Sequence, residues 1–214
     1  MPAIPMSRYS LPLFPLNVVS FPGGLMPLRI FETRYLDMVR SCLRNKTQFG
    51  LVAAMSAPAQ RKSEGLPFHR IGTRLEIIEA DVIELGMMHI RCRAEQRFRV
   101  LGAQQQGDGL WLGEVEDLPE ESALDIPADL ESTGSFLKQL MESLVEQGVE
   151  ESQLPFLKPY RFDDCAWVSG RWCEILAIPL GDKQRMLELD SPLVRLELVN
   201  DWIEAELAKG RRQE

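Results

Sequence analysis

Cysteine and histidine are the residues of this 214-residue chain that could carry nucleophilic or metal chemistry, and they are few. None of the four cysteines, at positions 42, 92, 165 and 173, forms a CxxC pair, and the two histidines are His69 and His89. Because zinc sites need ligands paired at short spacing, the sequence predicts no metal site. A Cys–His nucleophile is not expected either, since strand alternation points Cys92 and His89 to opposite faces.

Sequence signatures of common active sites are absent as well. The chain has no G-x-x-x-x-G-K-[ST] loop for nucleotide phosphates, and no G-x-S-x-G, H-E-x-x-H or G-x-G-x-x-G. Carboxylate pairs are too numerous in this acidic chain for any one of them to be informative. The sequence therefore predicts no ATP site, no cofactor and no catalytic residue.

Four arginines form the first candidate binding surface. They alternate with apolar residues in a strand-like stretch, at positions Arg91, Arg93, Arg97 and Arg99. This spacing predicts that all four stand on the solvent face of one hairpin, where they could bind an anion or a peptide. The alternative is an ordinary solvated face whose arginines pair across strands with Glu76, Glu79, Glu84 or Glu114.

An apolar segment forms the second candidate surface. It reads FPGGLMP over Phe21–Pro27 and is followed by Phe31 and Tyr35. Two glycines bend the chain there, and an exposed apolar rim could bind extended or unfolded peptide, because methionine adapts to varied side chains. The alternative is that these residues close the core of the β-rich half.

Strands and turns dominate the first 120 residues. Short apolar segments bounded by turn residues predict strands over 11–16, 25–30 and 48–55, alternating patterns predict several more between 75 and 118, and one helix is expected over 32–44. A phase shift at Ile78 predicts a bulge. Pro12 and Pro15 predict that 11–16 is an edge strand, since proline cannot donate to a ladder. Many short strands favour a closed or half-closed antiparallel sheet.

Helical periodicity dominates the rest of the chain. It predicts helices over 129–147, 164–177, 182–189 and 192–209, with Asp163 or Asp164 and Ser191 as N-caps. In the last helix the residues expected to face inward are Leu193, Leu196, Val199, Ile203 and Leu207. Residues 1–120 carry a net charge of +1 and residues 121–214 a net charge of −9. We predict an α+β protein with a β-rich lobe over 1–120 and a helical lobe over 121–214.

The composition also bears on location. No apolar run approaches the roughly 18–20 residues of a membrane-spanning helix, and Met1–Ser10 lacks the apolar stretch of a secretory signal. We expect a cytoplasmic protein with no membrane partner, whose cysteines stay reduced. The acidic balance, with a pI of about 5.0, makes nucleic acid an improbable partner, because phosphate contacts need clustered cations.

Short segments in one consistent order resemble the N-terminal substrate-binding domain of Lon proteases. The family pattern is roughly LPLFPL, then VLFPG, then LPLxIFExRY, and the chain shows LPLFPLNVVSFPG over 11–23 and PLRIFETRY over 27–35. The same pattern continues through Phe49-Gly50, Arg70–Thr73, Arg97–Val100, Glu114–Glu120 and Glu188–Leu196. The resemblance covers essentially the whole chain.

The resemblance implies a PUA-like pseudo-barrel with one helix, followed by a helical bundle. It implies a non-catalytic role in recognising exposed or unfolded polypeptide, because the family's ATPase and protease modules have no counterpart in these residues. The positions it marks as tentative peptide-binding residues are Phe21, Pro22, Leu25, Met26, Phe31, Glu32, Arg34 and Tyr35.

The resemblance leaves several roles open. The protein could hold unfolded segments as a chaperone-like binder, or act as an adaptor for a separate ATP-dependent protease. PUA-like barrels elsewhere bind RNA, so an RNA-binding module using the face of Arg91, Arg93, Arg97 and Arg99 is one alternative. A hydrolase or peptidase, suggested by the family label alone, is another.

Overall fold

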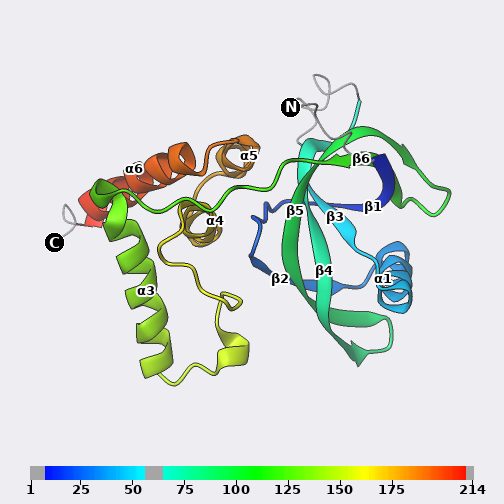
Figure 1. Ribbon diagram of the computed structural model, residues 1–214. Helices are drawn as coiled ribbons and strands as arrows, with labels where there is room; N and C mark the ends of the chain where they lie inside the picture. Colours follow the sequence, from blue (N-terminus) through cyan, green and yellow to red (C-terminus); the bar gives the residue numbers. More distant parts are fainter. Residues whose placement is uncertain (1–7, 56–64, 211–214) are drawn as a thin grey trace. The chain divides into compact units, whose positions relative to one another are not determined.

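The chain forms two compact units, which Figure 1 shows as ribbons. The computed structural model describes residues 8–55 and 65–210; most of the segment examined above for a secretory signal lies outside them. One unit holds the described residues up to Glu120 together with Pro179–Leu187, and the other holds Glu121–Ile178 and the described residues from Glu188 onward. No helix among the described residues is both long and apolar enough to cross a membrane.

A mixed sheet of six strands makes up most of the first unit (Figure 1). The strands are β1 Arg8–Leu16, β2 Leu25–Ile30, β3 Phe49–Ala54, β4 Phe68–Glu84, β5 Met87–Gln105 and β6 Trp111–Asp117. They pair in the order β2-β5-β4-β3-β1-β6, and β5 also pairs with β6. Five of the six strands therefore close a ring, which β2 extends on one side of β5. The likeness to PUA folds stays a prediction.

The expectation that residues 11–16 form an edge strand is wrong. β1 pairs antiparallel with β6 from Arg8 to Leu13 and parallel with β3 from Leu13 to Leu16. Because the strand changes partner at Leu13, each half has a neighbour on one side. Pro12 and Pro15 lie in different halves, so each missing N–H can fall on the side of the strand that carries no ladder.

Two apolar clusters hold the sheet. The first joins α1 (Thr33–Asn45) to β2, β3 and the first half of β5 through residues such as Val39, Phe49 and Ile90. The second joins β1, β5 and β6 through Leu13, Phe98 and related side chains. The predicted bulge is confirmed, because the β4–β5 register shifts between Ile77 and Glu79.

The short helix α5 (Leu180–Glu188) groups with the sheet, although its periodicity places it among the helices of the second half. Gln184 Nε2 donates to the carbonyl of Ile71 at 3.0 Å. Arg97 Nη1 donates to the carbonyl of Leu187 at 2.8 Å. These bonds fix both a middle turn and the C-terminal end of α5 to β4 and β5.

The second unit is helical. It contains α3 (Glu131–Glu146), α4 (Cys165–Ile175) and α6 (Pro192–Gly210), with short 3₁₀ turns at Ala128–Leu130 and Glu151–Gln153. Asp164 caps α4 by accepting from the backbone N–H groups of Ala166 and Trp167. Together with the first unit, this segregation of sheet and helices is the α+β class that the sequence predicts.

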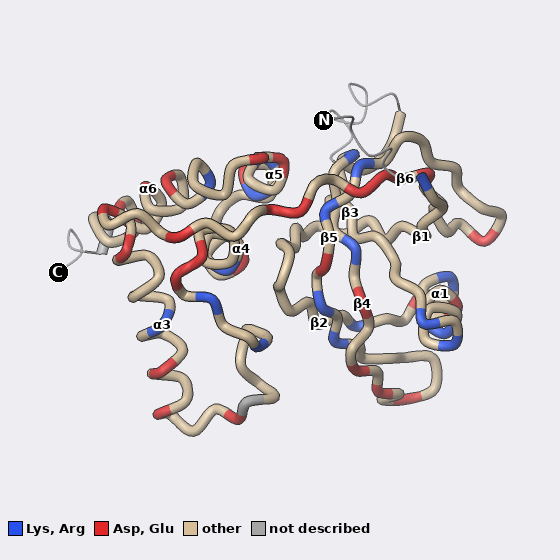
Figure 2. The backbone as a smooth tube through the Cα atoms, viewed as in Figure 1, with Lys and Arg blue, Asp and Glu red and all other residues tan. Residues whose placement is uncertain are grey.

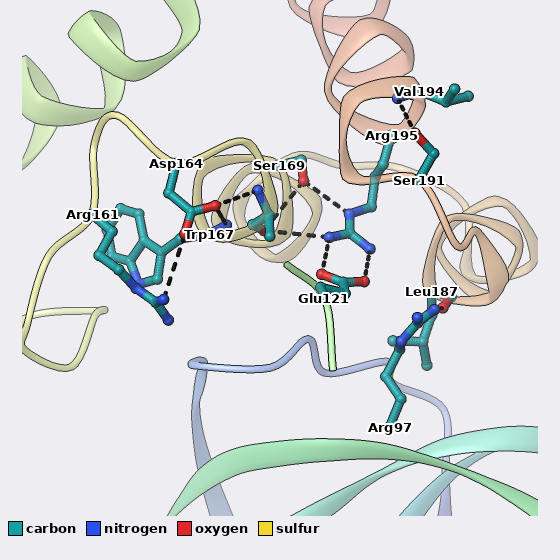
Figure 3. Close-up of polar contacts among 11 residues, drawn as sticks. Arg97, Glu121, Arg161, Asp164, Trp167, Ser169, Leu187, Ser191, Val194 and Arg195 are labelled. Carbon is teal, nitrogen blue, oxygen red and sulfur yellow. Dashed lines mark hydrogen bonds and ion pairs between the residues drawn. The ribbon is translucent and has the colours of Figure 1, made fainter. Parts of the chain in front are cut away.

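A buried ion pair ties the helical unit together (Figure 3). The guanidinium of Arg195 on α6 is fully buried and donates to both carboxylate oxygens of Glu121. Its Nε also donates to Ser169 Oγ on α4 at 2.8 Å. Of the five residues of α6 expected to face inward, Leu207 is instead half exposed, because it lies in the last turns of the helix.

Candidate functional site

The apolar residues that the sequence singles out as a binding rim lie mostly in the core. Phe21, Met26 and Tyr35 are buried, and the ring of Tyr35 lies 4.0 Å from that of Phe14, centroid to centroid. Pro22 and Leu25 are half buried. In this conformation a partner could reach no more than the edges of these side chains, so most of the segment packs the sheet.

Three further residues of that set lie at the surface around the start of α1. Phe31 is 64% exposed. Glu32 is exposed and pairs with Arg34 at 2.6 Å. Arg34 Nη1 also donates to the carbonyl of Gly109 at 3.0 Å, which holds the β5–β6 turn against α1. The structure thus leaves Phe31 as the one large apolar side chain of the predicted rim that is freely exposed.

The end of the β4–β5 hairpin carries exposed apolar residues that the sequence analysis missed. Val82 and Ile83 are 73% and 55% exposed, and Leu85 is fully exposed. The last residue of β2 pairs with the second residue of β5, so Phe31 follows β2 directly beside the closing residues of this hairpin. Phe31, Val82, Ile83 and Leu85 are called the hairpin-tip patch below.

The length of the hairpin explains this exposure. β4 and β5 have 17 and 19 residues, whereas β2 and β3 have six each. The pairing of β3 with β4 ends at Leu75, so the far end of the hairpin continues without a third strand on that side among the described residues. Alternation with Ala80 predicts an inward Val82, but a strand face is buried only where another layer covers it. The sequence did hold a signal of this exposure: three apolar residues lie within four positions of Gly86, in a turn region, and turns are usually polar.

The four arginines do not form a free cationic surface. Arg91 pairs with Glu79 at 2.8 Å, Arg93 with Glu76 at 3.8 Å and Arg99 with Glu116 at 3.5 Å. The register sets these residues opposite one another across strands. Figure 2 shows the resulting mixture of positive and negative stretches along β4, β5 and β6. Cross-strand pairing through Glu76 and Glu79 is therefore the alternative that the structure supports.

Arg97 is a correction to the predicted arginine face. Its side chain is buried and donates to the last turn of α5 rather than facing solvent. Thr73 pairs with Arg97 and Leu75 with Ala94, so β5 has one more residue than β4 between these two pairs. This extra residue interrupts the alternation just before Arg97. With Arg97 buried and the other three arginines paired, the cation cluster that RNA binding requires is lacking on this face.

Burial disfavours the thiolate form of three of the four cysteines. Burial raises the pKa of Cys92 to about 12 and also raises the pKa of Cys42 and of Cys165. His89 lies on the exposed face of β5, opposite the inward Cys92. Among the described residues, no group of three or more side chains is placed to hold a metal ion. Cys92 and His89 therefore do not form a Cys–His pair.

Comparison with known proteins identifies the fold and the family. The profile of the ATP-dependent protease La (LON) substrate-binding domain matches residues 10–205. Lon proteases of Anaeromyxobacter dehalogenans and Xanthomonas oryzae are 23% and 24% identical over 88% and 92% of this chain. The chain spans only 22% and 23% of the length of those two proteins.

A solved structure gives the same result. The Lon N-terminal domain protein from Xanthomonas campestris is 31% identical, with a TM-score of 0.70 over 91% of this chain and 98% of that one. The match therefore extends over both the sheet and the helical unit. The chain belongs to the family of Lon substrate-binding domains.

Proposed function

We propose that this protein recognises exposed or unfolded polypeptide segments and that the hairpin-tip patch makes the contact. The observation that carries the proposal is the set of four large apolar side chains exposed at one end of the sheet. Apolar side chains gathered at a surface usually mark a binding site. Membership of a family described as substrate-binding supports the same role.

The patch suits weak, sequence-tolerant recognition. Each of the four side chains would contribute on the order of 1 kcal/mol when a partner covers its exposed part. Ordering an extended peptide offsets a large share of that gain. We therefore expect micromolar affinity, which allows a bound segment to be released again.

Two uses of this surface follow from the resemblance to Lon domains. A chaperone-like binder would keep an unfolded protein from aggregating. An adaptor would in addition speed the degradation of that protein by a separately added Lon protease. We place the activity in the cytoplasm, a location supported by the four buried cysteines, which a reducing compartment keeps as thiols.

The test compares two matched double variants. Val82→Ser with Leu85→Ser removes apolar surface from the patch, whereas Val145→Ser with Leu207→Ser makes the same substitutions at residues of the helical unit that are also more than half exposed. Binding of a fluorescently labelled unfolded protein is followed by anisotropy. We expect the first variant to weaken binding roughly tenfold and the second to bind like the original chain. Equal binding by both variants would refute the assignment of the patch.

A further inference from the structure

We infer that the hairpin-tip patch selects apolar segments that are flanked by lysine or arginine. This inference rests on the proposed function and specifies its substrate class. The evidence is the charge that surrounds the apolar side chains at the end of the β4–β5 hairpin.

The hairpin end is acidic. Residues 79–87 contain three carboxylates and no lysine or arginine. Glu79 is neutralised by Arg91, but Asp81 and Glu84 are exposed and make no ion pair within the described part of the chain. Asp81 and Glu84 bracket Val82 and Ile83 in the sequence, so each exposed apolar side chain of the hairpin has a carboxylate within a few residues. Figure 2 shows this acidic stretch at the far end of the hairpin.

The neighbouring cations do not cancel this charge. Arg29 on β2 is the nearest arginine by register, opposite His89, and its Nε donates to Met87 Sδ at 3.0 Å. His89 in turn lies opposite Asp81. A cleft of about 460 Å³, lined in part by Arg29, Asp81 and His89, adjoins the tip on this face. Among the described residues, the hairpin end thus has one nearby arginine, Arg29, and two carboxylates without an ion pair, Asp81 and Glu84.

This charge decides between possible occupants. A segment with lysine or arginine beside its apolar residues gains attraction from Asp81 and Glu84 while its apolar side chains cover the patch. An acidic segment is repelled. A membrane with anionic headgroups is disfavoured for the same reason, since surface-binding elements normally present cations to such lipids.

The size of the preference follows from exposed ion pairs. Two such pairs, each worth a few tenths to about 1 kcal/mol, correspond to a roughly three- to thirtyfold difference in affinity. Because both carboxylates are exposed, the preference should shrink as salt rises from about 0.05 to 0.5 M. The apolar part of the binding should persist at the higher salt concentration.

The experiment uses three peptides with one apolar core and flanks of lysine, glutamine or glutamate. Their affinities are measured for the original chain, for Asp81→Asn with Glu84→Gln, and for the control Asp201→Asn with Glu197→Gln. The control removes two exposed carboxylates from α6. We expect the order lysine, glutamine, glutamate for the original chain and the control, and equal binding for the hairpin variant.

The outcomes separate this inference from the proposed function. Equal binding of all three peptides, or a lysine preference that survives in the hairpin variant, overturns the charge selection while leaving the patch as a binding site. If no peptide binds, or if Val82→Ser with Leu85→Ser leaves binding unchanged, the proposed function fails as well. Binding to vesicles containing anionic phosphatidylglycerol in preference to the lysine-flanked peptide would assign the patch to a membrane instead.

Discussion

Replacing Glu121 with Gln should destabilise the helical unit by about 3 kcal/mol, since breaking a buried ion pair typically costs 3–5 kcal/mol. Glu121 accepts from Arg195 Nη1 at 2.6 Å and from Nη2 at 2.5 Å (Figure 3). The Arg195 side chain is fully buried and that of Glu121 is 7% exposed. The pair joins α6 to the start of the unit, and Ser169 Oγ extends it to α4.

The expected loss of stability follows from the charge and the second hydrogen-bond acceptor that the glutamine amide lacks. The introduced glutamine would keep one oxygen acceptor, but its amide N–H groups would face a guanidinium that can only donate. The buried guanidinium of Arg195 would then lose the carboxylate that pairs with it through two hydrogen bonds. The retained hydrogen bond places the expected loss at the lower end of the range for broken buried pairs.

Urea unfolding followed by tryptophan fluorescence can measure this loss. Trp167, Trp172 and Trp202 all belong to the helical unit, so the signal reports chiefly on it. Glu120→Gln is the matched control, because the neighbouring Glu120 is exposed. Replacing both partners, with Glu121→Leu and Arg195→Met, should recover most of the stability, since apolar residues of similar volume can substitute for a buried pair.

Two results would refute this reasoning. If Glu121→Gln and Glu120→Gln unfold within about 0.5 kcal/mol of each other, which is the range of ordinary surface substitutions, the pair contributes nothing specific. If the apolar double variant is less stable than Glu121→Gln alone, the loss comes from packing around these residues rather than from an uncompensated charge.

Two further predictions concern the sheet unit. Gly72→Ala should destabilise it by about 3 kcal/mol or more, because the added Cβ would lie 2.2 Å from the carbonyl oxygen of Leu51. Gly102→Ala is the control, since a Cβ added there meets nothing within 4 Å. Equal urea midpoints for the two variants would contradict this prediction. The free energy of unfolding should fall between pH 9 and 12, because the unfolded thiol of Cys92 loses its proton near pH 9.0 while the folded thiol keeps it to about 12. Urea unfolding at pH 8 and 10.5 should show a smaller drop for Cys92→Ala than for the original chain, and an equal drop would exclude Cys92 as the cause.

Features set by neighbours along the chain could be predicted from the sequence. The bulge next to Ile78, the outward and inward alternation of residues 88–93, and the caps at Asp164 and Ser191 all appear in the structure. Each depends on the few residues around it, through strand alternation or a side-chain bond to a nearby backbone N–H. The short motifs in order along the chain also indicated the family.

Features set by contacts between distant segments could not. β1 lies between β3 and β6 because it pairs with both of these distant strands, and Arg97 is buried because α5, about 90 residues later, receives its hydrogen bond. The binding residues proposed here were missed for the same reason.

The sequence by itself determined that β4 and β5 form strands with alternating faces, and that the chain resembles the Lon substrate-binding domains. Only the tertiary structure decided which of those faces are covered. At the hairpin tip Val82 follows the inward pattern yet remains exposed, because the pairing of β3 with β4 ends at Leu75, before the hairpin does. Periodicity records the direction in which a side chain points, and burial requires a second layer that a distant part of the chain must supply.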